Sequence, residues 1–376
     1  MIKSLKTEKN YKQDRRIVVT LDAGGTNFVF GAMQGCEFIT HPLRIPANAH
    51  DLDLCLSAII EGFAEIISGL DVPPVAISFA FPGPADYPNG IIAGHLPNFP
   101  SFREGVALGP FIKQKFRIPV YINNDGNLFA YGEALGGTLP EINRQIELTG
   151  SDKQYRNLTG VTFGTGFGCG VVINGQLLLG DNASGGDIWC FRNSLYPEYI
   201  VEESVSIRAV KRVYRELSAD NRELTPQNIF DIAEGLIDGN TEAAKKSFYE
   251  MGQAAGDALS MVATIVDGII VIGGGLTGAS KYIIPAICKE MQSNIKMMNG
   301  ESFCRMQTEV FNLDDEKSFS QFCKTKSVPI KIFGSDRFAQ YNPDKRIGIA
   351  TSKLGAEKAI SVGAYIFALD SIDKTN

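Results

Sequence analysis

The chain of 376 residues carries a formal net charge of −6, and 44% of its residues are apolar while 21% are charged. These values are typical of a globular protein with enough material for two domains and their cores. Because the charge balance is acidic, there is no bulk attraction to nucleic acid or to an anionic membrane. We therefore expect neither as a partner.

The cysteines and the N-terminal segment predict a cytoplasmic protein. The seven cysteines are odd in number and no pair has CxxC spacing, which argues against a disulfide framework and against a cysteine-rich zinc site. Residues 1–16 are polar and lack the apolar core of a signal peptide. The longest apolar run, residues 261–272, is interrupted by Asp267 and is too short to span a bilayer.

The first half of the chain predicts alternating strands and helices. Residues 17–22 and 28–32 are apolar runs on either side of a Gly-Gly-Thr turn, which is typical of strand, turn and strand. Apolar residues then recur with a helical period over residues 51–70. The next predicted elements are a strand at 75–79, a strand at 120–122, a helix at 127–135 and a polar stretch to residue 157 that we expect to separate two lobes.

The second half opens on the same plan about 140 residues later. It begins with predicted strands at 158–163 and 171–173, joined by Gly-Thr-Gly-Phe-Gly. Further predicted elements are helices at 201–217 and 242–264, a buried strand at 269–272, a surface excursion at 300–326 and a final helix at 360–369. Strands that alternate with helices predict an α/β fold, here in two similar lobes.

Three glycine-rich turns, at residues 24–26, 164–168 and 273–275, each follow an apolar strand. Glycine lets the backbone approach a ligand closely, and N–H groups in such turns can hold phosphate oxygens. One such turn is common in hairpins, but three in one chain favour a phosphate site. A Walker A loop is excluded because Ala279 takes the lysine position, and a dinucleotide fingerprint because Cys169 replaces the third glycine.

Two carboxylates stand at the ends of apolar strands, where α/β folds bind ligands. Asp125, in Asn-Asn-Asp-Gly at 123–126, can take a proton from a sugar hydroxyl while the asparagines fix the sugar, or it can cap the following helix. Asp22 can hold a magnesium-bound water beside the phosphates, or it can start a hairpin turn. The pattern alone leaves both alternatives open.

Taken together, these motifs resemble the ROK family of sugar kinases, which belongs to the actin- and hexokinase-like ATPases. The resemblance runs from about residue 17 to residue 369. The motifs occur in the family's order at residues 21–27, 82–84, 98, 124–125, 132–133, 164–168, 272–275 and 352–364.

The resemblance implies a two-lobed α/β fold of the ribonuclease H-like (actin-like ATPase) type, with an active-site cleft between the lobes. The first lobe would comprise residues 15–137, joined by a returning C-terminal helix at 355–372, and the second lobe residues 138–354. A homodimer is a further expectation from the family. Residues 141–157 and 300–328 are longer than the family needs, and the sequence suggests no role for them.

The resemblance also implies an ATP- and Mg²⁺-dependent kinase that phosphorylates a hydroxyl of a hexose-type sugar, with glucose as the first expectation. Asp125 would be the general base. The implied sugar contacts are Asn98, Asn124, Asp187 and Glu202, with Glu198 or Glu203 as alternatives to Glu202. The implied ATP contacts are Asp22, which would also hold Mg²⁺ through water, Gly24, Gly25, Thr26, Thr165, Gly166, Gly274 and Gly275.

The chain departs from the family at residues 185–190, Gly-Gly-Asp-Ile-Trp-Cys. The family usually has Gly-Glu-x-Gly-His and a cysteine-rich zinc loop. Here Asp187 replaces the glutamate, Trp189 stands near the histidine position, and only Cys190 remains of the cysteines, so we expect no zinc site. Trp189 is expected to be a core or lid residue, since tryptophan is mostly buried. The departures leave the identity of the sugar open.

Two alternatives to a kinase remain. One is a sugar-binding regulatory protein with little turnover, and the other is a superfamily ATPase that acts on something other than a sugar. Family members that repress transcription carry an N-terminal helix-turn-helix domain. About sixteen polar residues precede the first predicted strand, too few for that motif, so we expect no DNA binding.

Overall fold

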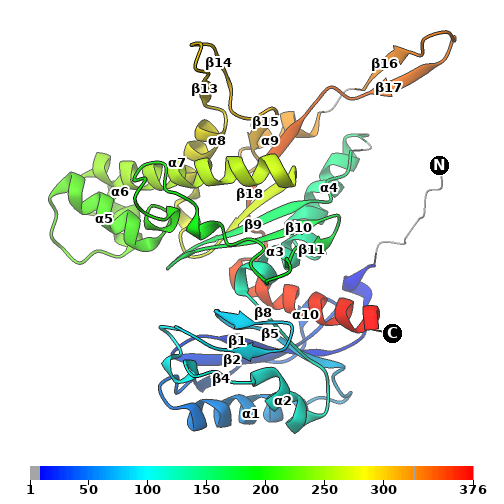
Figure 1. Ribbon diagram of the computed structural model, residues 1–376, viewed down its shortest axis with the longest axis vertical. Helices are drawn as coiled ribbons and strands as arrows, with labels where there is room; N and C mark the ends of the chain where they lie inside the picture. Colours follow the sequence, from blue (N-terminus) through cyan, green and yellow to red (C-terminus); the bar gives the residue numbers. More distant parts are fainter. Residues whose placement is uncertain (1–8, 152, 325–326, 376) are drawn as a thin grey trace. The chain divides into compact units, whose positions relative to one another are not determined.

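The computed structural model describes residues 9–151, 153–324 and 327–375, which form two compact units (Figure 1). Unit 1 contains the chain up to Gly136, the segment Leu179–Ala183 and the chain from Glu357 onwards. Unit 2 contains Gly137–Leu178 and Ser184–Ala356. None of the described helices is long and apolar enough to cross a membrane.

A mixed sheet forms the centre of unit 1, with the strand order β3-β2-β1-β5-β8. Its strands are β1 (Val18–Ala23), β2 (Asn27–Gln34), β3 (Glu37–Phe38), β5 (Ala76–Ala80) and β8 (Val120–Asn123), and β4 (Leu43–Pro46) pairs with β2. The first three strands are antiparallel, whereas β5 and β8 run parallel to β1. This order and these directions are those of the ribonuclease H-like fold that the family resemblance implies. A small hairpin, β6 (Ala85–Asp86) and β7 (Ile91–Ile92), follows β5.

Helices cover both faces of this sheet. One face carries α1 (Leu52–Ser68) and α2 (Leu108–Phe116), and the other carries α3 (Asp125–Leu135) and α10 (Ala356–Thr375) (Figure 1). The α1 helix begins at Asp51, whose carboxylate accepts a hydrogen bond from the Leu54 backbone N–H at 3.0 Å. Its buried Phe63 packs edge-on against Phe30 of the sheet, at 5.1 Å between ring centroids.

The α10 helix comes from the end of the chain and packs tightly against α3. A Cβ atom added to Gly363 would lie 1.8 Å from the Leu128 carbonyl oxygen, and one added to Gly132 would lie 2.0 Å from that of Ala359. Only glycine fits at these two positions, because the helix backbones approach more closely than any side chain allows.

Unit 2 is built on the same plan. Its sheet has the order β11-β10-β9-β12-β18-β15, with β9 (Leu158–Phe163), β10 (Phe167–Ile173), β11 (Gln176–Leu177), β12 (Ile269–Gly273), β15 (Glu309–Asn312) and β18 (Arg346–Thr351). The first three strands in the chain are antiparallel, and β12, β18 and β15 are parallel to β9 or to one another. The α/β prediction is therefore confirmed.

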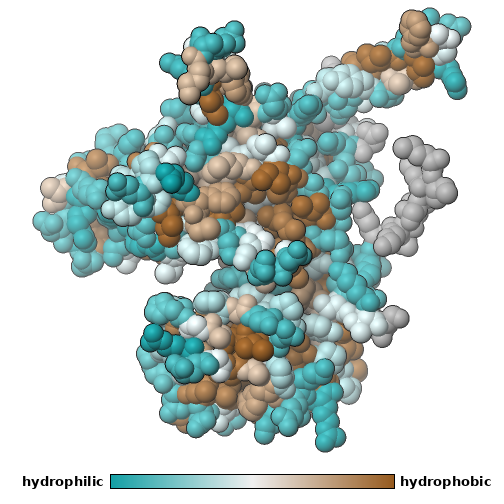
Figure 2. All heavy atoms as spheres, viewed as in Figure 1, coloured by the Kyte–Doolittle hydropathy of each residue, from teal (hydrophilic) through white to brown (hydrophobic). Residues whose placement is uncertain are grey.

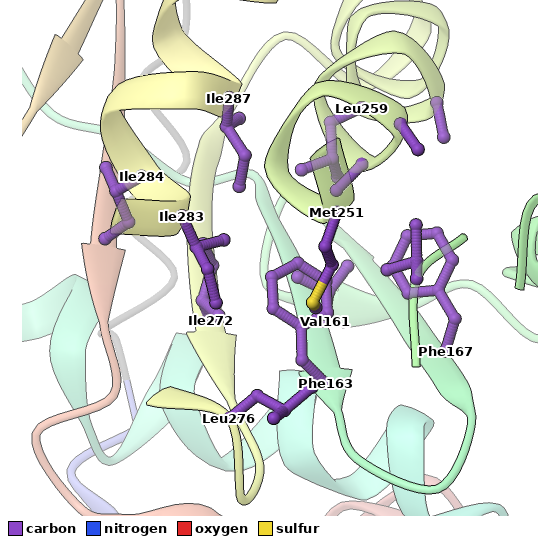
Figure 3. Packing of buried hydrophobic residues seen from close by; sticks show 14 of the residues in the cluster. Val161, Phe163, Phe167, Met251, Leu259, Ile272, Leu276, Ile283, Ile284 and Ile287 are labelled. Atoms are coloured by element: carbon purple, nitrogen blue, oxygen red, sulfur yellow. The ribbon is translucent and has the colours of Figure 1, made fainter. Parts of the chain in front are cut away.

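Helices α7 (Thr241–Val266) and α8 (Ser280–Met291) pack against this second sheet and enclose its core (Figure 3). Phe163 of β9, Met251 of α7 and Ile287 of α8 meet there, all at most 1% exposed. The remaining helices of unit 2 are α4 (Thr138–Leu148), α5 (Ile207–Ser218), α6 (Pro226–Ala233) and α9 (Glu316–Cys323). Two separate hairpins are formed by β13 (Asn294–Lys296) with β14 (Ser302–Cys304), and by β16 (Val328–Lys331) with β17 (Phe338–Tyr341).

Two segments differ from the sequence prediction. The polar stretch after residue 137 begins with the helix α4, because Leu139, Ile142 and Ile146 recur at helical spacing and are buried. The predicted excursion at 300–326 contains β15, a strand of the central sheet. Its buried pair Val310 and Phe311 is too short a run to stand out from the polar residues around it.

A buried carboxylate ties the N-terminal segment to the last helix within unit 1. Asp370 of α10 accepts hydrogen bonds from the Tyr11 hydroxyl at 2.5 Å, from the Lys9 ammonium at 3.0 Å and from the Tyr131 hydroxyl. Burial opposes ionisation of Asp370, but these hydrogen bonds outweigh it and lower the pKa of the carboxyl group. The ionised carboxylate therefore stabilises the fold.

We expect Asp370→Asn to lower the free energy of unfolding at pH 7 by about 1–3 kcal/mol, since three donors lose a charged acceptor. Thermal melting would show a shift of about 2–4 °C per kcal/mol for a unit of this size. Because the folded pKa lies below the unfolded value of about 3.9, the difference from the wild type is complete at neutral pH. It shrinks as the pH falls through the folded pKa.

The matched control is Asp373→Asn, on the same helix. Asp373 pairs with Lys9 and Arg16 near the surface, at 2.9 and 2.6 Å. A surface pair contributes only about 0–1 kcal/mol. Equal melting temperatures for the two variants at pH 7 would contradict the role given to Asp370.

Candidate functional site

In unit 1, the candidate residues gather at the carboxyl ends of three adjacent parallel strands. The register places Asp22 of β1 beside Ala80 of β5, and Ala80 beside Asn123 of β8. With about 4.8 Å between strands, the backbones of Asp22 and Asn123 are about 10 Å apart. Asn124 and Asp125 follow directly, so both candidate carboxylates lie on the same edge of the sheet, where α/β folds bind ligands.

The glycine turn after β1 has no room for side chains. A Cβ atom on Gly24 would lie 2.8 Å from the Asn27 carbonyl oxygen, and one on Gly25 would lie 3.1 Å from the Asn98 Cβ. Asn98 therefore lies against this turn, although it is far along the chain, and its side chain is exposed. The structure thus brings Gly24, Gly25, Thr26 and Asn98 together with the carboxylate edge.

Asp125 is the first residue of α3, and the cap of that helix is its neighbour. The Asn124 side-chain oxygen accepts a hydrogen bond from the Gly126 backbone N–H at 2.8 Å, and the N-cap position is Asn124. One oxygen of Asp125 accepts from the same N–H at 2.8 Å. Asn123 fixes the turn through a 2.8 Å bond from the Asn124 N–H. A cap role alone therefore does not explain Asp125.

Both carboxylates are less acidic than usual. Solvent reaches Asp22 and Asp125, but protein atoms surround each on most sides, and this desolvation raises the pKa of both. At Asp22 the charge of Glu357 adds to the shift, that of Arg44 opposes it, and that of Asp125 adds to it. At Asp125 the Gly126 N–H opposes the shift. The two acids therefore lie within electrostatic reach of each other.

Unit 2 has its own pair of glycine turns at the carboxyl edge of its sheet. The turn at 164–168 follows β9 and the turn at 273–275 follows β12, and these strands are parallel neighbours. Gly274 has φ of +92°, and a Cβ atom there would lie 2.4 Å from the Phe163 carbonyl oxygen. The two turns are therefore in contact, and this contact requires glycine at position 274.

Two other glycines of these turns face open space. A Cβ atom on Gly164 or Gly275 would meet no atom within 4 Å. Neither residue has a positive φ, so neither is glycine for conformational reasons. Open space beside a glycine backbone is what a closely bound phosphate or nucleoside requires.

Glu202 is bound to the first of these turns. One of its oxygens accepts a hydrogen bond from the Phe167 backbone N–H at 2.9 Å, and the other accepts from the Arg208 guanidinium at 3.0 Å. Arg208 also donates to the Thr165 carbonyl oxygen at 3.1 Å and to Glu203 at 2.7 Å. Thr165, Gly166 and Glu202 are thus held together, and Glu202 supports the turn itself.

Arg208 was not among the residues predicted from the sequence. It lies in the first turn of α5, where a positive charge opposes the helix dipole. The helix predicted at 201–217 puts Arg208 near its middle, so no local feature of the sequence pointed to this residue.

Asp187 lies in a loop that packs on β10. Gly186 has φ of +102°, and a Cβ atom there would lie 2.8 Å from the Cys169 carbonyl oxygen. Burial, with a smaller effect from the Asp187 charge, raises the pKa of Cys169 to about 12. Trp189, expected in the core or in a lid, is 42% exposed, so the core alternative is wrong. Ile188, at 4%, occupies the inward position instead.

Within residues 9–151, 153–324 and 327–375, no three His, Cys, Asp or Glu side chains come together as a group that could hold a metal ion. The candidate residues of unit 1 are grouped around Asp22 and Asp125, and those of unit 2, apart from Asp187, around the two glycine turns.

Known proteins resemble this chain over most of its length. The sequence profile of the ROK family matches residues 18–315. The crystal structure of a glucokinase from Parabacteroides distasonis is 59% identical in sequence, with a TM-score of 0.88 over 96% of this chain and 99% of that one. A ROK family glucokinase from Streptomyces griseus, in complex with glucose and AMPPNP, is 18% identical with a TM-score of 0.57, over 93% and 98% of the two chains. The second likeness supports the fold alone.

Curated relatives are more distant. A glucokinase of Thermotoga maritima is 27% identical over 175 residues, and a xylose repressor of Bacillus spizizenii is 23% identical over 241 residues. These matches cover 46% and 61% of this chain, and about half of each relative, 49% and 56%. Since the family profile covers most of the chain and a 59% identical structure covers nearly all of it, the chain belongs to the ROK family and has its actin-like ATPase fold.

Proposed function

We propose that the protein is an ATP-dependent kinase that transfers a phosphoryl group to a hydroxyl of a hexose, with glucose as the first candidate. The observation that carries the proposal is the position of Asp125, a solvent-accessible carboxylate with a raised pKa, next to Asn124 and on the same sheet edge as Asp22. The relatives support it, since a 59% identical structure is that of a glucokinase, and a more distant glucokinase binds glucose and AMPPNP.

In this mechanism the sugar hydroxyl loses its proton to a carboxylate oxygen of Asp125. The hydroxyl oxygen bonds to the γ-phosphorus as the bond to the leaving ADP oxygen breaks. A raised pKa makes Asp125 a better proton acceptor, once ionised, than an ordinary carboxylate. The amides of Asn98 and Asn124 would orient the sugar, with Asp187 and Glu202 as further contacts. Orientation of this kind supplies much of the rate in phosphoryl transfer.

The glycine turns would hold ATP. We assign Gly24, Gly25 and Thr26 to the terminal phosphate, Thr165 and Gly166 to the other phosphates, and Gly274 and Gly275 to the adenosine. The open space beside Gly164 and Gly275 fits a ligand that approaches the backbone. The exposed oxygens of Asp22 fit a hard cation such as Mg²⁺ reached through water. When bound, the ion would neutralise charge on the phosphates.

A sugar-binding regulator with little turnover is the second candidate. The match to a xylose repressor and the altered sequence at residues 185–190 favour it. An assay of ADP release across glucose, mannose, fructose and N-acetylglucosamine separates the two candidates. A kinase releases ADP with at least one sugar, whereas a regulator binds a sugar in a calorimetric titration and releases none.

We expect Asp125→Asn to lower kcat by about 100- to 10,000-fold, the usual effect of losing a positioned base. Binding of a non-hydrolysable ATP analogue should be unchanged, as measured by calorimetry. Asp53→Asn is the matched control, because Asp53 also lies in the first turn of a unit 1 helix. If Asp125→Asn kept more than about a tenth of wild-type kcat, outside that range, the assignment of the base would be wrong.

The fall of kcat/KM at acid pH should reflect protonation of the Asp125 carboxylate. Because the folded pKa of Asp125 is raised, kcat/KM should fall at a higher pH than an ordinary aspartate, near 3.9, would produce. Folding favours the protonated form, so the wild type should gain stability relative to Asp125→Asn as the pH falls through the folded pKa. Rates and melting temperatures between pH 4 and 8 test both, and an inflection at or below about 4 would argue against the role.

Substitutions at two neighbouring glycines should distinguish an effect on stability from an effect on ATP binding. Gly274→Ala forces a side chain into the left-handed region and against Phe163, which should cost about 1–3 kcal/mol of stability. Gly275→Ala meets no protein atom, so its melting temperature should stay unchanged while its ATP dissociation constant rises. Unchanged ATP affinity in Gly275→Ala would contradict the role of this turn.

A further inference from the structure

A groove runs along the outer edge of β8, within unit 1. Its volume is about 550 Å³, which suits a small molecule. Its walls come from the β6–β7 hairpin, β8, α10 and the segment Leu179–Ala183, all of which belong to unit 1. The residues proposed above to bind sugar or ATP do not line it. The proposed function therefore leaves this groove unexplained.

The wall that β8 forms carries outward-facing backbone groups. Among the described strands, only β5 pairs with β8, so the other edge of β8 belongs to no ladder. The Phe81 N–H donates to the Asn123 carbonyl oxygen at 3.0 Å, so the backbone of Asn123 faces β5. Because the N–H and C=O groups of successive residues point to opposite edges of a strand, those of Val120 and Ile122 face the groove. A ligand in the groove can therefore both donate to this wall and accept from it.

Asn123 brings a buried donor to the lining of the groove, and the residue is only 1% exposed. Its Oδ1 atom accepts hydrogen bonds from the Asn124 backbone N–H at 2.8 Å and from the Asn127 side-chain amide at 3.1 Å. These two donors fix the orientation of the amide, so the other branch is the nitrogen. That Nδ2 atom has no hydrogen-bond partner in the part of the chain that the structure describes. Because an unpaired buried donor is costly, a ligand oxygen that accepts from Nδ2 would be favoured.

Aromatic rings and carboxylates complete the lining. The rings are those of Tyr87, Tyr121 and Phe367, and the carboxylates are those of Asp86 and Asp181. Tyr121 packs edge-on against Phe367, at 6.3 Å between ring centroids. The Tyr87 hydroxyl donates to the Phe81 carbonyl oxygen at 2.9 Å, which fixes the third ring. Apolar patches occur among hydrophilic residues over the surface of unit 1 (Figure 2), so an apolar lining alone would not mark a site. Its combination with a buried donor and two exposed carboxylates does.

These groups select the chemical class of the ligand. None of the described lining residues is Lys, Arg or His, so the two carboxylates repel an anion such as a phosphate ester. An amine suits carboxylates and aromatic rings, but an ammonium group cannot accept from Asn123 Nδ2. A hydroxyl group both donates and accepts, so a polyol satisfies the carboxylates, Nδ2 and the strand edge together. A sugar adds C–H faces that pack on aromatic rings.

We propose that this groove binds an uncharged mono- or disaccharide, at a second site separate from the proposed catalytic one. One ligand hydroxyl accepts from Asn123 Nδ2, others donate to Asp86 and Asp181, and a face of the sugar ring packs on the aromatic side chains. Asp86 already accepts from the Asn89 backbone and side chain at 3.2 and 2.8 Å, one bond to each oxygen, and each oxygen has room for another. Binding in the groove does not depend on the proposed kinase activity.

Calorimetric titration of the full chain with glucose, N-acetylglucosamine and maltose tests the proposal, with glucose 6-phosphate and putrescine as charged probes. At least one uncharged sugar should bind at a site that Ser371→Trp removes, because Ser371 lines the groove and an indole there fills it. Asp181→Asn, in an exposed segment, should raise the dissociation constant of that site about five- to tenfold, since a carboxylate is the stronger acceptor.

The matched control is Ser361→Trp, on the same helix but outside the groove. Both serines are half-buried, and each donates to the carbonyl oxygen four residues earlier, at 3.1 Å for Ser361 and 2.7 Å for Ser371. Ser361→Trp should therefore bind the sugar as the wild type does. If Ser371→Trp lowers the melting temperature, Asp181→Asn carries the test.

Asn98→Ala separates the groove from the proposed catalytic site, because Asn98 is a proposed sugar contact and does not line the groove. It should leave the groove site unchanged. A chain that binds sugar in the groove and releases no ADP with any sugar contradicts the proposed function alone. The groove proposal is overturned if Ser371→Trp and Asp181→Asn bind every uncharged sugar as the wild type does. It is also overturned if these variants lose affinity only for glucose 6-phosphate or for putrescine.

Discussion

The close approach of α10 to α3 is the contact on which unit 1 depends. Gly132 and Gly363 let two helices that are far apart in the sequence meet with their backbones in contact. The α3 helix carries Asp125 at its first turn and follows β8 directly. The position of the candidate base is therefore set by a helix from the end of the sequence. Asp370 of α10 also accepts hydrogen bonds as a charged carboxylate. Close packing and electrostatics therefore both hold α10 in place within unit 1.

The two sheets explain why the candidate residues lie where they do. In each unit, three antiparallel strands are followed by parallel ones, and the parallel strands end at a common edge. The glycine turns after β1 and β9 lead into the antiparallel strands β2 and β10, whereas the turn after β8 starts the helix α3 with Asn124 as its cap. Backbone geometry and the proposed ligand contacts therefore both restrict which residues can stand in these turns. Gly274 is required by backbone geometry, whereas Gly164 and Gly275 are not and lie beside open space.

Much of this arrangement could be predicted from the sequence, because apolar runs that end in glycine turns are strong local signals. The strands β1, β5, β9 and β12 and the helices α1 and α7 were predicted within a few residues. The helix α4 was missed because its apolar residues are few among many polar ones, and β15 because four residues carry too little pattern. Trp189 is not in the core, one of the two places expected for it, because Ile188 takes the inward position of the 3₁₀ turn. Contacts between distant residues, such as Arg208 with Thr165, leave no local pattern at all.

The completion of unit 1 by α10 has a consequence for the way the protein is made. The sheet of unit 1 is complete by Asn123, but one of its faces is not covered until α10 forms, and α10 begins 233 residues later, at Ala356. At 5–20 residues per second, a ribosome needs about 10–45 s to reach it. During that interval the apolar surface around Leu128 and Ala80 is uncovered, while most of unit 2 can already form. This apolar surface of the nascent first unit therefore stays exposed to water until α10 has been made.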